Sequence, residues 1–151
     1  MKNILLTLLL LALWIPVTLD KIINFRVFKT GILRQPFNHD LGLVLVYALP
    51  VLEAFTVILL LFPTLRKWGF ALSTLLMLAF TGYIAVALAD TWKHLPCGCG
   101  SVISSLSWEQ HFFFNLFFLV VSGYGFYQMN LPQGGAAGGE TAKGGPAKRQ
   151  P

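Results

Sequence analysis

Four long apolar segments alternate with short polar ones along the chain. They cover residues 3–19, 41–62, 68–89 and 108–129. Each comes close to the roughly 20 apolar residues that a helix needs to cross a bilayer. Between the first two, residues 21–39 alternate basic with apolar side chains. That pattern is too charged to span and is typical of a short helix on the membrane surface, here ended by Gln35-Pro36. The hydrophobic pattern therefore predicts an all-α membrane protein: a four-transmembrane-helix bundle with a short interfacial amphipathic helix between helices 1 and 2.

The first apolar segment has the positive start and the leucine-rich centre of a signal peptide. A cleavage site needs small residues, however, and the residues from Ile15 onward are bulky and then charged, ending in Asp20-Lys21. We therefore expect a retained transmembrane helix that Pro16 bends near its end.

The two ends of the last apolar segment carry clear boundary signals. Ser107 precedes the segment and Gln110 follows three residues later, which is the spacing of a capping box at a helix start. Residues 132–151 consist mainly of Gly, Ala, Pro, Lys and Glu without apolar periodicity. Such a segment cannot bury a core, so we expect residues 1–130 to form one transmembrane domain followed by a disordered tail.

The composition agrees with a membrane protein and does not agree with a nucleic-acid-binding protein. Apolar residues make up 56% of the chain and charged residues 11%, whereas soluble proteins carry about 25% charged residues. The net charge of +5 is spread over loops and tail, without the basic cluster and interleaved aromatic residues of a nucleic-acid surface. The lipid bilayer is therefore the expected partner, and nucleic acid is not.

The only two cysteines, Cys97 and Cys99, stand one residue apart in a turn sequence with glycine on both sides of Cys99. A disulfide across one residue closes a very small, strained ring, which makes it oxidising and a poor structural staple. A redox-active dithiol pair is the favoured interpretation. Two thiolate ligands for a soft metal, or two inert thiols, remain as alternatives, and we expect no metal.

Polar residues near this pair could assist its chemistry. Trp108, His111 and Asn115 have the spacing of one helix face, just after the cysteine loop. His111 could accept a proton from an attacking thiol or stabilise a thiolate; alternatively, His111 and Asn115 form a hydrogen-bonded pair inside the bundle. His94 could join His111 and the cysteines in a zinc site, but structural zinc sites rarely use so tight a cysteine spacing.

Glu53 is a carboxyl group near the middle of an apolar segment. A carboxyl at that depth is costly and normally faces the bundle interior or a polar cavity. It could relay protons for a thiol or quinone reaction, or it could pair with Lys21 or His111 and hold helices together.

The distribution of positive charge indicates the orientation. Four spans put both termini and the Arg66-Lys67 turn on one side, which then carries 6 of the 11 Lys and Arg residues. The positive-inside rule favours cytoplasmic termini. The cysteine loop then faces the oxidising side of the membrane, where a disulfide persists.

An ordered series of motifs resembles the MauE/DoxX-type family of redox-associated membrane proteins over about residues 4–128. The motifs are Asp20-Lys21 before Phe25 and Phe28, Gln35-Pro36-Phe37, Leu49-Pro50 with Glu53, Pro63 with Arg66-Lys67 and Gly69, Phe80-Thr81 with Tyr83-Ile84, Pro96-Cys97-Gly98-Cys99-Gly100, and Trp108 with His111 and Asn115. The resemblance implies four transmembrane helices in a bacterial inner membrane and a periplasmic thioredoxin-like or client protein as partner. It also implies thiol–disulfide chemistry for Cys97 and Cys99, with Glu53 and His111 as the next catalytic candidates and Trp108 and Asn115 in support.

Two functions follow as hypotheses. In the first, the chain is a thiol–disulfide oxidoreductase that exchanges electrons through its cysteine pair; no cofactor follows from the residues themselves, and quinone is the candidate for the other electron carrier. In the second, the chain is a non-catalytic membrane anchor or assembly subunit of a larger complex. Loss of partner activity in a protein without the two cysteines would separate them.

Overall fold

The computed structural model describes residues 2–35, 38–89 and 107–131. They form five α-helices: α1 (Lys2–Ile23), α2 (Phe25–Leu33), α3 (His39–Leu61), α4 (Arg66–Leu88) and α5 (Trp108–Asn130). The four long helices, α1, α3, α4 and α5, are long and apolar enough to cross a membrane. The predicted all-α membrane bundle, with a short helix between the first two long ones, is confirmed.

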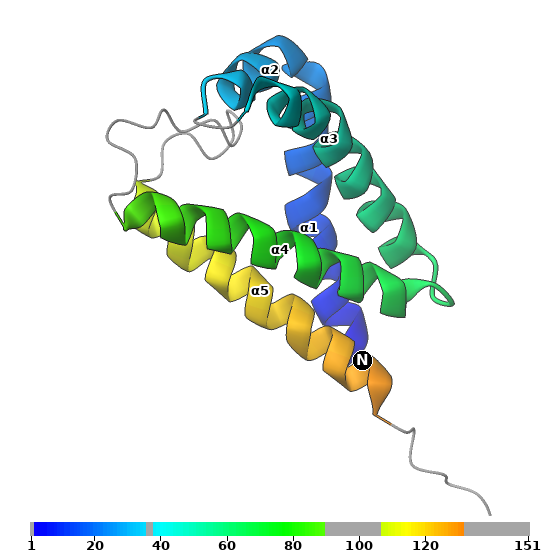
Figure 1. Cartoon of the computed structure of the whole chain (residues 1–151). Helices are drawn as coiled ribbons and strands as arrows, with labels where there is room; N and C mark the ends of the chain where they lie inside the picture. The colour runs from blue at the N-terminus through cyan, green and yellow to red at the C-terminus, as the bar shows by residue number, and fades with distance from the viewer. Residues whose placement is uncertain (1, 36–37, 90–106, 132–151) are drawn as a thin grey trace, which may run out of the picture.

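The four long helices form an open bundle in which each packs against two of the others (Figure 1). α5 packs along most of α4, α3 packs against α4 on another side, and α1 contacts both α3 and α5. The short helix α2 lies across one end of the bundle, where it contacts α3 and α1. The N-terminus lies at the opposite end, beside the end of α5.

The first helix is longer than predicted. The expected span ended at residue 19, with Lys21 in the surface segment, but α1 continues through Lys21 to Ile23. Pro16 lies inside α1 and does not end it. The physical reason for the extension is that Lys21 is buried with an anionic partner from α3, so the helix need not stop where its first charged residues appear.

Local hydrogen bonds start two of the helices. The capping box predicted for α5 is confirmed: the Ser107 hydroxyl accepts from the Gln110 backbone at 3.3 Å, and the Gln110 side chain accepts from the Ser107 backbone at 3.0 Å. At the start of α3, the Asn38 side chain accepts from the Asp40 backbone at 3.3 Å. These bonds satisfy amide groups that a helix start otherwise leaves without partners.

The core is apolar but contains polar links between helices. Its buried members are Leu10, Leu13, Trp14, Leu60, Phe70, Leu76 and Met77. Within it the indole of Trp14 on α1 donates a hydrogen bond of 2.9 Å to the Ser73 hydroxyl on α4. Without water in the bilayer to replace it, such a bond fixes how the two helices face each other.

Large apolar side chains cover the outer surfaces of the long helices. Leu5, Val44, Leu75 and Phe113 are all more than half exposed, one on each long helix. An apolar surface of this extent would associate in water, whereas the hydrocarbon of a bilayer solvates it. The exposed surface therefore agrees with the membrane prediction.

The α4–α5 contact contains one very close approach. Gly125 of α5 faces the ring of Phe70 on α4, so closely that a Cβ atom at residue 125 would lie 2.2 Å from a ring carbon. Only glycine fits at this point, because Phe70 is itself completely buried.

Candidate functional site

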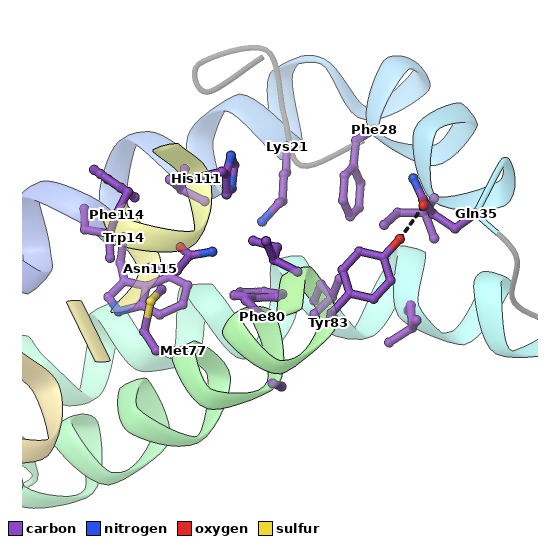
Figure 2. A pocket seen from close by; sticks show the side chains of 17 residues that line it. Trp14, Lys21, Phe28, Gln35, Met77, Phe80, Tyr83, His111, Phe114 and Asn115 are labelled. Carbon is purple, nitrogen blue, oxygen red and sulfur yellow. Dashed lines mark hydrogen bonds between the residues drawn. The ribbon is translucent and has the colours of Figure 1, made fainter. Parts of the chain in front are cut away.

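A cavity of about 300 Å³ lies inside the bundle, toward the end that carries α2 (Figure 2). All five helices contribute to its lining, which is mostly aliphatic and aromatic. The lining residues are Leu13, Trp14, Val17, Lys21, Phe28, Ile32, Gln35, Leu45, Leu49, Met77, Ala79, Phe80, Tyr83, Ile84, His111, Phe114 and Asn115. Sequence reasoning did not predict this cavity, since its residues come from segments that meet only in the folded bundle.

A buried ion pair stands beside the cavity. The Lys21 ammonium on α1 donates a hydrogen bond to Oε1 of Glu53 on α3, and the two side chains are only 5% and 0% exposed. The sequence left Lys21 and His111 as possible partners for Glu53; the partner is Lys21. Two opposite charges in a region of low dielectric constant attract strongly, and neither can be removed without leaving the other unbalanced.

The Lys21 ammonium also connects α1 to two further helices. It lies 5.5 Å from the ring centroid of Phe28 on α2 and 5.5 Å from that of Phe80 on α4. Both distances are within the range of a cation–π interaction. One ammonium group therefore contacts side chains of α2, α3 and α4 at once, and Figure 2 shows it directed into the cavity.

His111 and Asn115 line the same cavity from α5. Both are buried, with 3% and 5% exposure, and their shared face agrees with the prediction from their spacing. No hydrogen bond joins the two side chains in the part of the chain that the structure describes, and Nδ1 of His111 has no hydrogen-bond partner there. The alternative of a His111–Asn115 pair is therefore not supported. The side chain of Trp108 lies outside the described part.

A third polar contact closes the far side of the cavity. The Tyr83 hydroxyl on α4 donates a hydrogen bond to Oε1 of Gln35, just after α2 (Figure 2). Gln35 in turn donates to the Gly31 carbonyl at 3.3 Å. The sequence predicted Gln35-Pro36 as the end of the surface helix and used Tyr83 only as part of a family motif, so it did not predict that the two side chains meet.

The cysteine pair lies outside the described residues, as do His94 and the tail 132–151. The chain places the pair between Leu88, the end of α4, and Trp108, the start of α5. Tyr83, near that end of α4, and His111, near that start of α5, both line the cavity. Within residues 2–35, 38–89 and 107–131, no three His, Cys, Asp or Glu residues form a group that could hold a metal ion.

Comparison with known proteins identifies a family. A family model described as "Methylamine utilisation protein MauE" matches residues 2–128, which include all of the described helices except the last two residues of α5. No curated protein and no solved structure matches the chain.

Proposed function

Because this chain belongs to the MauE family of multi-pass membrane proteins, we propose that it exchanges thiols and disulfides through Cys97 and Cys99. One observation is the main support for this proposal: the only two cysteines of the chain stand one residue apart, in the segment between the cavity-lining helices α4 and α5. The proposed partner is a thioredoxin-like or client protein in the periplasm of a bacterium.

The exchange needs two attacks. In the first, the thiolate of one cysteine attacks a sulfur of the partner's disulfide, which forms a mixed disulfide and releases one partner thiolate. In the second, the other cysteine attacks the mixed disulfide, which forms the Cys97–Cys99 disulfide and releases the second partner thiolate. The partner gains two electrons and two protons, and the pair loses them. The reverse steps oxidise the partner.

His111 is the proposed proton acceptor for the attacking thiol. Its support is the buried imidazole, whose Nδ1 has no hydrogen-bond partner among the described residues. Glu53, the other catalytic candidate, already holds Lys21 through one carboxylate oxygen, while its Oε2 has no described partner. If Glu53 relays protons, Oε2 can carry them while Oε1 stays hydrogen-bonded to Lys21.

Trapping of the mixed disulfide tests this function. In Cys97→Ser or Cys99→Ser protein, the resolving thiol is absent, so at least one variant should accumulate a covalent complex with the partner on non-reducing gels, while the double variant forms none. His111→Ala should slow trapping, because the attacking thiol loses its proton acceptor. His39→Ala is the matched control, since His39 is exposed at the start of α3.

The redox potential of the cysteine pair gives a second prediction. We expect Cys97 and Cys99 to equilibrate with a glutathione redox buffer at about −200 mV.

Full partner activity with the double serine variant would contradict the exchange mechanism. The chain would then serve as a non-catalytic anchor or assembly subunit. A pair that stays reduced under mild oxidant, or that binds copper or zinc stoichiometrically, would also contradict it.

The proposed orientation has its own test in whole cells. With termini in the cytoplasm and the cysteine loop in the periplasm of the inner membrane, a membrane-impermeant maleimide should label reduced Cys97 or Cys99 from outside the inner membrane. Protein without the two cysteines is the blank, since the chain has no others. Labelling only after the cytoplasmic face is opened would reverse the orientation.

A further inference from the structure

The cavity walls favour a flat, lipid-soluble ligand. Its aromatic members come from four helices: Trp14, Phe28, Phe80, Tyr83 and Phe114. Two of these rings, Phe28 and Phe80, lie at equal 5.5 Å distances from the Lys21 ammonium. The volume of about 300 Å³ is at the lower end of the range for small-molecule sites and is large enough for a ring. Since the surrounding helices are membrane-spanning, a ligand from the lipid phase can reach it.

The cavity also presents hydrogen-bond donors that the described protein does not use. An ammonium has three N–H donors, and the described residues accept only one from Lys21, at Glu53. His111 and Asn115 reach the same cavity. Asn115 can donate from its amide, and Nδ1 of His111, buried without a partner in the described structure, can donate once it has accepted a proton. Buried polar groups without partners are costly. A ligand with acceptor oxygens would satisfy them.

The charge balance of the site selects a neutral ligand. Glu53 already neutralises Lys21, and its second oxygen, also buried, has no partner among the described residues. A carboxylate or phosphate ligand would place a second anion beside Glu53, which is unfavourable at low dielectric constant. An acyl chain would be neutral, but it brings no acceptor to Lys21 or His111. A quinone ring is neutral, flat and lipid-soluble, and it carries two carbonyl acceptors.

We propose that this cavity binds the ring of a lipid-soluble quinone, with a carbonyl oxygen accepting a hydrogen bond from the Lys21 ammonium and with His111 and Asn115 on the α5 side. The inference rests on the proposed function for its redox role, which it deepens by naming the electron acceptor. This applies to the direction in which the pair oxidises its partner and so receives two electrons from it. Two cysteine thiols and one quinone then become one disulfide and one quinol, and two electrons and two protons pass to the quinone oxygens.

The cavity is not sealed by its lining side chains. Partly exposed lining residues are found on all five helices, among them Leu49 of α3, and Ala79 of α4 is exposed. A bulky residue at Leu49, one helical turn before Glu53, should fill part of the cavity and obstruct binding there.

Binding is tested with the full chain carrying Cys97→Ser/Cys99→Ser in lipid nanodiscs, so that no exchange chemistry interferes. The probes are a ubiquinone with one isoprenoid unit and menadione, and binding is followed by isothermal titration calorimetry, whose signal does not depend on the number of tryptophans. We expect saturable binding of one ring per chain. Asn115→Leu, which removes one hydrogen bond, should weaken it about tenfold. Leu49→Trp should weaken it at least as much.

The controls separate this inference from the proposed function. Val51→Trp adds the same bulk on α3 at a position that is 67% exposed and outside the cavity, and should leave binding unchanged. Non-saturable partitioning, or equal affinity in Leu49→Trp, Asn115→Leu and Val51→Trp, would overturn the quinone site even if mixed disulfides are trapped. With cysteines present, quinone should oxidise the reduced pair; saturable binding without that oxidation would overturn the electron-transfer step.

Discussion

Lys21→Met is expected to destabilise the bundle by about 3–5 kcal/mol, the usual cost of removing one partner from a buried ion pair. The cause is Glu53, whose completely buried carboxyl group would be left without a counter-ion. The same substitution also removes the ammonium from between the Phe28 and Phe80 rings. The measurement is the thermal denaturation of purified protein in a mild detergent.

The double variant Lys21→Met/Glu53→Leu distinguishes the effect of an unpaired charge from the effect of altered side-chain packing. With both charges gone and similar side-chain volumes, most of the stability should return, because apolar replacements for a buried pair are often neutral. Lys67→Met removes an ammonium at an exposed site and should change little. A double variant as unstable as Lys21→Met would contradict the electrostatic explanation.

The same double variant separates the two roles that the sequence left open for Glu53. If Glu53 only holds α1 against α3, the folded double variant should still trap a mixed disulfide at the wild-type rate. If Glu53 relays protons, trapping should slow although the protein folds.

Gly125→Ala is expected to destabilise the α4–α5 contact by about 1–3 kcal/mol, as overpacking does. The new Cβ would lie 2.2, 2.4 and 2.9 Å from three ring carbons of Phe70. The ring is fully buried, so it cannot swing into lipid without losing its place in the core. The gain in helix propensity, about 1 kcal/mol, is too small to offset this strain. Thermal denaturation in detergent measures the change.

Two variants provide the comparison for Gly125→Ala. Gly82→Ala makes the same change on α4 where no heavy atom lies within 4 Å, and it should be neutral or slightly stabilising. Adding Phe70→Leu to Gly125→Ala should restore part of the loss, because the smaller side chain makes room. If Gly125→Ala is as stable as Gly82→Ala, the close approach has no energetic importance.

Predictions that depend on local sequence agreed with the structure. The capping box of Ser107 and Gln110 involves residues three apart, and the shared face of His111 and Asn115 follows from the helical repeat. The apolar segments predicted the four long helices, because bilayer thickness sets their length.

Features that depend on long-range packing were harder to predict. Lys21 and Glu53 are 32 residues apart, and Tyr83 and Gln35 are 48 apart. The cost of an unpaired carboxyl predicted a partner for Glu53, but choosing Lys21 over His111 required the way α1 and α3 pack. The end of α1 was misplaced for the same reason, since a charge was taken as the end of the span. The cavity had no sequence signal, and the cysteine pair lies outside the described residues.

The Lys21–Glu53 pair also bears on how the chain enters the membrane during synthesis. Glu53 lies well inside α3, and a lone charged group at such depth costs a few kcal/mol on insertion. Lys21 lies near the end of α1, from which an unpaired ammonium can still reach the headgroups. α1 can therefore insert into the bilayer first. Insertion of α3 costs less once α1 is in place and Lys21 can pair with Glu53. The order of synthesis, with the cation before the anion, suits that sequence of events.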